Sequence, residues 1–339
     1  MRGGSAVTAS QLVAEVSRQR DAVVLLLGDI NVDLLLEIPE YPRPGGDGVA
    51  SSQRIGLGGS AANSAIMLRR LGLRASMLSA IGDDRWAEVA VEALRAEGVG
   101  LEYVVRDPHE PTSLNVIGVT PDGERTMMAY RGANPRYSPA DLPEEAIAAC
   151  DFLHVSGYAF LQAPQSLAAA RAIEVATANG VPVSLDIPVD PARREPATIR
   201  RLLRFTDLLV VGVPEARQLV GTAEPAEACR RLRDLGARTV ALKVGRDGTV
   251  IASGDEWVEL PGLPVRTVDT TGAGDSFCAG AIAAMLAALP LAKIGAFANL
   301  LGAAAVEKPG AGQSLPTLDE LRRIECSISG DLTSRCGHA

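Results

Sequence analysis

The most informative stretch of this sequence is Asp269-Thr270-Thr271-Gly272-Ala273-Gly274-Asp275-Ser276-Phe277. Its two glycines can adopt positive φ and carry no Cβ, so consecutive backbone N–H groups can turn toward one anion. An apolar run from 276 to 289 follows directly and stops before Pro290, which predicts a buried helix that begins right after the loop. The first N–H groups of a helix lack partners and favour a phosphate. The stretch therefore predicts a phosphate-binding loop.

Asp275 stands at the junction of this loop and the helix, where it has two interpretations. It could be a helix N-cap, for which Asp is a preferred residue. It could instead be a general base that accepts a proton from an attacking hydroxyl beside the phosphates. The local position alone favours the cap. The whole string favours the base, because a simple cap needs neither two glycines nor Asp269.

A second glycine motif, Gly58-Gly59-Ser60-Ala61-Ala62-Asn63-Ser64-Ala65, precedes a predicted helix that runs to about Arg70. Before and between the two motifs, short apolar runs typical of buried strands alternate with helical patterns. This alternation predicts an α/β fold with a mainly parallel sheet that binds ligands outside the carboxyl ends of its strands. The predicted strands are 22–27, 75–80, 152–155, 181–185, 208–211 and 239–244.

The two motifs, in this order and separation, resemble those of the ribokinase or PfkB-like carbohydrate kinases, and the resemblance extends from Val24 to about Leu321. It implies a three-layer α/β/α sandwich with a small antiparallel β lid, made here by about 34–55 and 113–130. An ordinary hairpin excursion would give the same extended pattern around the predicted turn Pro121-Asp122-Gly123. The expected organisation is an N-terminal extension (1–21), one kinase domain (22–325) and a flexible C-terminal tail (326–339).

The resemblance also implies roles for single residues. Asp275 matches the catalytic base, and the backbone amides of Gly272, Ala273 and Gly274 match the anion hole. Asp33 taken alone is equally well read as a solvated Asp at a strand end, and Asn63 could cap a helix. Their places in the motifs favour contact with the acceptor, whose matching residues are Asn31, Asp33, Gly58, Gly59 and Asn63.

ATP, Mg²⁺ and a monovalent cation are implied in the same way. The ATP positions are Lys243, Gly245, Gly248, Thr271 and Asn299, although Gly245-Arg246-Asp247-Gly248 alone is a common turn and Asn299 is equally an exposed helix residue. Glu215 matches an indirect Mg²⁺ residue. The positions that match K⁺ ligands are Asp269, Thr271, Ala305, Lys308, Gly310 and Ser314.

Two departures from the family pattern concern function. Gly212 replaces the Asn of an Asn-x-x-Glu string, and Ser60 replaces a Lys that ribokinases proper carry. The expected activity is ATP-dependent phosphorylation of a hydroxyl on a small sugar or sugar-like acceptor. A nucleoside kinase and a non-catalytic sugar- or nucleotide-binding protein are the alternatives; aromatic residues for a base are few, Tyr130 and Tyr158 being candidates. Arg131 could pair with an acidic acceptor or be a solvated loop arginine.

Composition narrows the class of protein further. The chain has 339 residues, with 33 basic and 41 acidic residues and a net charge of −8, which argues against a nucleic-acid-binding surface. Its apolar runs are too short to span a bilayer. Five cysteines lack Cys-x-x-Cys spacing and no signal core follows Met1, so we expect a cytoplasmic protein without zinc or disulfides. In some relatives the lid also makes a dimer contact, so a homodimer through the lid is a further expectation.

Overall fold

A nine-stranded sheet forms the centre of the computed structural model, which describes residues 8–122 and 124–324. The strand order is β13-β12-β11-β10-β9-β8-β1-β4-β5, and only the β11–β12 and β12–β13 pairings are antiparallel. The predicted mainly parallel α/β sheet is thus confirmed. Its strands are β1 (Val23–Leu27), β4 (Arg74–Gly82), β5 (Gly100–Asp107), β8 (Phe152–Ser156), β9 (Val183–Asp186), β10 (Leu208–Gly212), β11 (Thr239–Lys243), β12 (Gly248–Ser253) and β13 (Glu256–Pro261).

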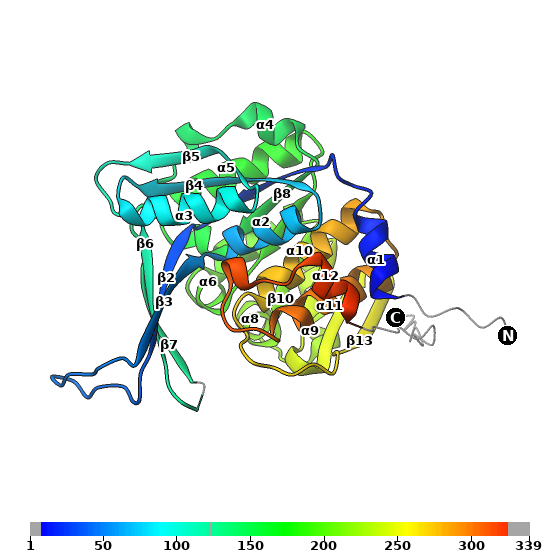
Figure 1. The fold of residues 1–339 in the computed structure, drawn as a ribbon. Helices are drawn as coiled ribbons and strands as arrows, with labels where there is room; N and C mark the ends of the chain where they lie inside the picture. Colours follow the sequence, from blue (N-terminus) through cyan, green and yellow to red (C-terminus); the bar gives the residue numbers. More distant parts are fainter. Residues whose placement is uncertain (1–7, 123, 325–339) are drawn as a thin grey trace.

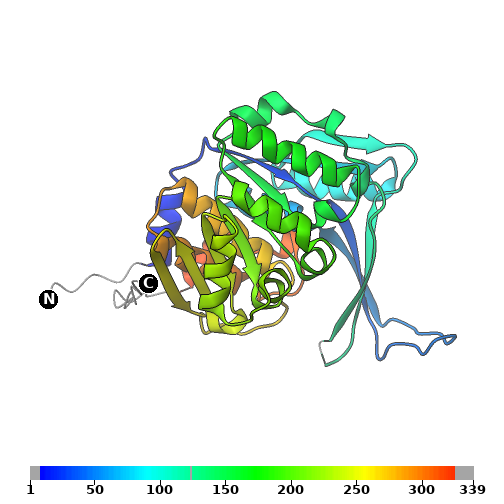
Figure 2. The same cartoon turned by 180° about the vertical axis from the view of Figure 1, so that it is seen from behind.

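Helices cover both faces of this sheet (Figures 1 and 2). Strand β1 shows why, because Val24 and Leu26 are buried in one apolar core and Leu25 and Leu27 in the other. The first core takes α1 (Ala9–Val16), α2 (Ser60–Arg70), α3 (Arg85–Ala96), α10 (Ala273–Leu286), α11 (Leu291–Ala305) and α12 (Leu318–Arg323). The second takes α4 (Glu144–Ala149), α5 (Gln165–Ala178), α6 (Val189–Arg194), α7 (Pro196–Leu202), α8 (Val213–Val220) and α9 (Pro225–Asp234).

A smaller sheet stands off one side of the layered body (Figures 1 and 2). It has the order β3-β2-β6-β7, with β2 (Asn31–Glu37), β3 (Ser52–Gly58), β6 (Ser113–Val119) and β7 (Arg125–Tyr130). The β2–β3 and β6–β7 pairings are antiparallel, and the β2–β6 pairing is parallel. Residues 38–51, part of the predicted extended segment, connect β2 and β3 without strand structure. This small sheet corresponds to the predicted lid.

The helix after the phosphate loop begins three residues earlier than the apolar run suggested. Gly272 is its N-cap in the left-handed region (φ 75°), and Ala273, Gly274 and Asp275 already belong to the first turn of α10. A Cβ at position 272 would also lie 2.7 Å from Leu315 Cδ2, so both the positive φ and the lack of space require glycine. The interpretation of Asp275 as the N-cap is therefore wrong.

The sequence predicted an N-terminal extension and a C-terminal tail outside the kinase domain. Within the expected N-terminal extension, Thr8 caps α1, and Leu12 and Val16 of that helix are fully buried against the body. The expected tail at 326–339 and the turn residue Gly123 lie outside the described residues. No helix within the described ranges is long and apolar enough to cross a membrane.

Candidate active site

The carboxylate of Asp275 is held by two side chains from the second glycine motif. Ser60 Oγ donates to Asp275 Oδ1 at 2.7 Å, and Asn63 Nδ2 donates to Asp275 Oδ2 at 2.7 Å. Both donors lie in the first turns of α2, whose N-cap Gly59 has φ 102° and would place a Cβ 2.3 Å from the Asp29 carbonyl oxygen. Since Gly59 is the cap, Asn63 does not cap this helix. The two glycine motifs thus meet at one carboxylate.

The pKa of Asp275 is raised to about 6, mainly by burial and also by the nearby carboxylate of Asp186, while the hydrogen bonds from Asn63 and Ser60 and the charge of Lys243 act to lower it. A carboxyl group with a pKa near neutrality is suited to accept a proton and to release it again. The environment therefore gives Asp275 the chemistry that a general base needs.

Backbone amides lie beside this carboxylate in the first turn of α10. Within residues 8–122 and 124–324, nothing accepts a hydrogen bond from the N–H of Gly272 or Gly274. The N–H of Ala273 donates to Thr270 O at 3.3 Å. Two of the three predicted anion-hole amides are thus free at the positive end of a 14-residue helix.

Two further charged residues, Lys243 and Asp186, lie near the phosphate loop. Lys243, at the end of β11, forms an ion pair of 3.1 Å with Asp186 Oδ1, at the end of β9. A Cβ on Gly274 would lie 3.2 Å from Lys243 Nζ, so glycine lets the ammonium approach the helix start. Burial lowers the pKa of Lys243 but the Asp186 carboxylate outweighs this and raises it, so the lysine stays charged.

Sequence reasoning missed Asp186 and the role of Ser60. Asp186 directly follows the predicted strand 181–185, at the sheet edge where ligands bind, and that position was the available signal. Its Oδ2 also lies 3.4 Å from Ser60 Oγ. The bond from Ser60 to Asp275 crosses 215 positions of sequence and left no local signal.

The predicted acceptor residue Asp33 lies in β2 of the small sheet. Asp33 is 9 % exposed and accepts a hydrogen bond from Asn115 Nδ2 at 2.8 Å. Burial raises the pKa of Asp33, although Asn115 and the charge of Arg125 oppose this. A Cβ on Gly58 would lie 2.2 Å from Asp33 Oδ1, which explains the glycine. Asp33 is therefore a buried, oriented carboxylate and not a solvated strand end.

Asn31 and Arg131 belong to networks that the sequence did not reveal. Asn31 Oδ1 accepts from Asn134 Nδ2 at 2.8 Å. Arg131 donates to both carboxylate oxygens of Asp29 and, at 2.7 Å, to Gln165 Oε1. Its side chain is 20 % exposed, so it is not a solvated loop arginine, and its Nη1 is buried with no hydrogen-bond partner among the described residues.

The predicted nucleotide residues lie at the carboxyl end of β11 and beyond. Gly245 (φ 61°) and Gly248 (φ 108°) shape the turn into β12, and a Cβ on Gly248 would overlap the Leu260 carbonyl oxygen. Asn299 of α11 donates to Pro261 O at 3.3 Å. Thr271 Oγ1 donates to Asp269 Oδ1 at 2.6 Å. No ligand contact tests these assignments, which stay predictions.

Glu215 occupies the space that the missing Asn side chain leaves. A Cβ on Gly212 would lie 2.4 Å from Glu215 Oε2. That oxygen is buried and has no hydrogen-bond partner among the described residues. Within the same residues no group of three or more His, Cys, Asp or Glu is arranged to hold a metal ion. A buried carboxylate oxygen without a donor suits a water of a hydrated Mg²⁺.

The residues that match K⁺ ligands are partly committed to other contacts. Asp269 Oδ1 accepts from Arg125 Nη1 and Asp269 Oδ2 from the N–H of Gly310, each at 2.7 Å. Lys308 Nζ pairs with Glu320 at 2.7 Å. Ala305 is the last residue of α11, and Ser314 ends a short 3₁₀ turn (Gly312–Ser314) near Gly310.

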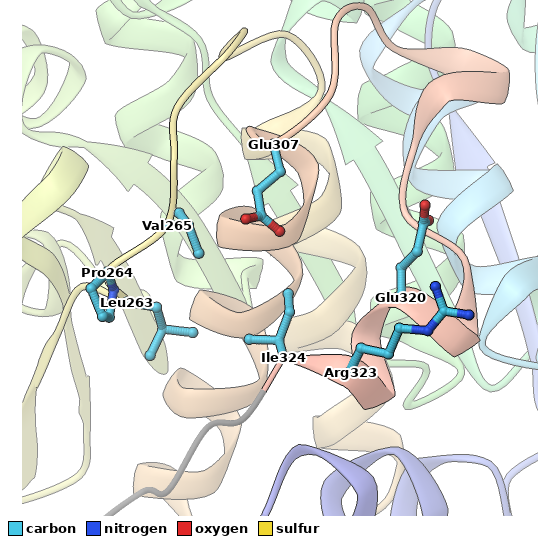
Figure 3. Close-up of a pocket in the computed structure, with 7 residues that line it drawn as sticks. All are labelled: Leu263, Pro264, Val265, Glu307, Glu320, Arg323 and Ile324. Atoms are coloured by element: carbon cyan, nitrogen blue, oxygen red, sulfur yellow. The ribbon is translucent and has the colours of Figure 1, made fainter.

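Two cavities lie near these elements. One, of about 390 Å³, is bounded by Asp33 and Leu57 of the small sheet and by Thr271, Gly310 and Ser314 of the body. The other, of about 400 Å³, lies between the loop at 263–265 and α12, with Glu307 and Ile324 between them (Figure 3). None of the predicted site residues lines this second cavity. The first cavity joins the small sheet to the phosphate loop.

The fold and the residues of this site are typical of kinases that phosphorylate a hydroxyl group of a small molecule. The family model described as pfkB family carbohydrate kinase matches residues 22–318. The chain therefore belongs to the pfkB family of carbohydrate kinases, as the two motifs predicted, and its class is that of the sugar kinases.

Relatives of established name agree with this. The chain is 29 % identical over 310 residues to a ribokinase of Staphylococcus aureus, covering 89 % of this chain and 99 % of that protein. It is 32 % identical over 297 residues to an ATP-dependent ribose-1-phosphate kinase of Halopiger xanaduensis, covering 87 % and 95 %. The solved structure of Arabidopsis thaliana ribokinase complexed with ribose and ATP is 25 % identical, with a TM-score of 0.76 over 89 % and 97 % of the two chains.

Proposed function

We propose that this chain transfers the γ-phosphoryl group of ATP to a hydroxyl of a small sugar or sugar-like acceptor, with Asp275 as general base. In this reaction the acceptor oxygen bonds to the γ-phosphorus, the bond to the bridging oxygen breaks, and ADP leaves. The acceptor proton passes to the Asp275 carboxylate. The observation that carries the proposal is the pairing of Asp275, with its pKa of about 6, and the free amides of Gly272 and Gly274.

The surrounding residues have complementary tasks. Ser60 and Asn63 orient the base, and Asp33 would replace the water hydrogen bonds of the acceptor's hydroxyls. Lys243 would add positive charge where the phosphoryl group carries negative charge. The proposed ATP site comprises Lys243, Gly245, Gly248, Thr271 and Asn299.

Kinases of this family use ATP and Mg²⁺. A bound Mg²⁺ neutralises the phosphate charge, and Glu215 Oε2 is the proposed partner of its water shell. K⁺ is the further cation that the family resemblance implied, and its matching residue Asp269 is paired with a guanidinium in this structure.

A nucleoside acceptor is the second candidate. Burial, together with the charges of Asp275, Asp186 and Asp29, raises the pKa of Tyr158 to about 12, so this residue lies in electrostatic reach of the proposed base. A ring at this place would suit stacking on a nucleobase. A location in the cytoplasm and a homodimer through the small sheet remain parts of the proposal that rest on the sequence.

The test is ADP release from ATP and Mg²⁺ across a panel of sugars, sugar acids, sugar phosphates and nucleosides. Turnover on at least one acceptor is expected, and Asp275→Asn should lower kcat by about 10² or more. Asp319→Asn, a change on the exposed face of α12, is the matched control that should retain activity. Binding without turnover on any acceptor would instead favour the non-catalytic alternative.

A further inference from the structure

An arginine of the small sheet reaches the loop that carries the proposed catalytic base. Arg125 is the first residue of β7, and its Nη1 donates to Asp269 Oδ1 at 2.7 Å across 144 positions of sequence. The side chains of Arg125 and Asp269 are 26 % and 10 % exposed, so this ion pair is shielded from most of the solvent. The small sheet is thus tied electrostatically to the body at the start of the phosphate loop.

The other contacts of Asp269 connect it to the geometry of that loop. Its Oδ1 also accepts from Thr271 N at 2.9 Å and from Thr271 Oγ1 at 2.6 Å, and its Oδ2 accepts from Gly310 N at 2.7 Å. Thr271 precedes Gly272, the left-handed cap that starts α10 and places Asp275 in the first turn. The Asp269 carboxylate therefore holds Thr271, the residue directly before the cap of α10.

These contacts leave little capacity for a metal ion. A carboxylate has about four lone-pair sites, and Asp269 accepts three hydrogen bonds on Oδ1, from Arg125 and Thr271, and one on Oδ2, from Gly310. A guanidinium in direct contact would also repel a second cation. The Asp269 carboxylate, paired with Arg125, therefore does not fit the monovalent cation that the family resemblance implied.

We propose that Arg125 supplies the positive charge of this site, so that the phosphate loop is positioned by an arginine of the small sheet and not by K⁺. The proposal rests on the proposed kinase activity and makes Arg125 a positioning residue that acts through Asp269. The same guanidinium lies in electrostatic reach of Asp33, whose pKa it lowers, so one charge serves the acceptor side and the phosphate loop together.

The experiment compares KCl with choline chloride at equal ionic strength, in wild type and in Arg125→Gln. Activity and the midpoint of thermal unfolding are both measured. For wild type we expect less than about twofold difference in kcat and no shift of the midpoint, because no cation binds the folded state. For Arg125→Gln in choline we expect kcat to fall by about tenfold or more, with KCl restoring part of it and raising the midpoint.

Arg43→Gln is the matched control, because Arg43 is an exposed arginine of the segment between β2 and β3. It should behave as wild type in both salts. If Arg125→Gln does not fold, Arg125→Lys retains the charge and should stay independent of KCl. Activation of wild type by KCl of about tenfold, or a KCl-dependent rise of its midpoint, would overturn the proposal.

The two readouts separate this proposal from the proposed function. A wild-type protein that turns over no acceptor would refute the kinase activity, yet its unfolding midpoint in the two salts would still show whether a cation binds. Turnover that KCl strongly activates would support the kinase activity and refute the role of Arg125.

Discussion

The side-chain amide of Asn63 donates to Asp275 Oδ2 at 2.7 Å, across 212 positions of sequence. The same amide accepts, through Oδ1, a hydrogen bond of 3.0 Å from the N–H of Gly312. Asn63 thus fixes the base against α2 on one side and against the turn before α12 on the other. A carboxylate held by two donors has a defined orientation, and the first two predictions concern its protonation state.

The pH dependence of activity should report the environment of Asp275. Because the base must be ionised to accept a proton, kcat/KM should rise with pH through about 6 and then level off. Asp186→Asn removes a neighbouring negative charge and should move the rise of kcat/KM to lower pH. Ser60→Ala removes a hydrogen bond to the Asp275 carboxylate and should move the rise of kcat/KM to higher pH. Shifts of both variants in one direction would contradict this account.

The stability of Asp275→Asn should depend on pH. The folded-state pKa of Asp275, about 6, lies above its ordinary value of 3.8, so the folded state binds the proton more tightly than the unfolded state. The stabilisation from this proton is complete below about pH 3.8 and is lost as pH rises through about 6. Replacement by Asn should therefore raise the unfolding midpoint relative to wild type at pH 7 and change it less at pH 4. Calorimetry at both pH values measures this, and a variant less stable at pH 7 than at pH 4, each relative to wild type, would contradict it.

Gly58→Ala should damage the acceptor site. The new Cβ would lie 2.2 Å from Asp33 Oδ1, so the carboxylate must move, at a cost of about 1–3 kcal/mol in the free energy of unfolding. The KM for the acceptor should rise more than the KM for ATP. Gly56→Ala on the same strand is the control, because a Cβ there meets nothing within 4 Å. Equal effects of the two alanines would show that the contact with Asp33 is not the cause.

Lys243→Met should destabilise the protein strongly. The change leaves Asp186, whose side chain is 5 % exposed, as an unpaired buried charge, which typically costs about 3–5 kcal/mol. Adding Asp186→Asn should recover part of this loss, as denaturant unfolding would show. Lys308→Met is the control, since its pair with Glu320 is about one-third exposed and should contribute about 1 kcal/mol or less. A double variant no more stable than Lys243→Met would argue against the pair.

The alternation of apolar runs was sufficient to predict the fold, and it located β1, β4 and β8 to β11 to within a few residues. It missed β5 and β13, the two edge strands of the large sheet, and β12, which pairs with β13. The edge strands β5 and β13 are less completely buried, so their residues show no continuous apolar run, whereas β12 is buried but its apolar run is only Val250-Ile251-Ala252. The start of α10 was also placed late, because Gly272 begins the helix through its backbone conformation and the first turn holds polar residues.

The sequence by itself determined the family and the sandwich and singled out Asp275 as the proposed base, because glycines and a carboxylate at fixed spacing are local requirements of backbone geometry and charge. Only the tertiary structure decided which side chains surround that base. Ser60, Asp186 and Lys243 come from α2, β9 and β11, and Arg125 reaches Asp269 from a separate sheet. Such pairings depend on how the fold brings strand ends and helix starts to one edge of the sheet. The distance between two residues in the folded chain cannot be read from their separation in the sequence.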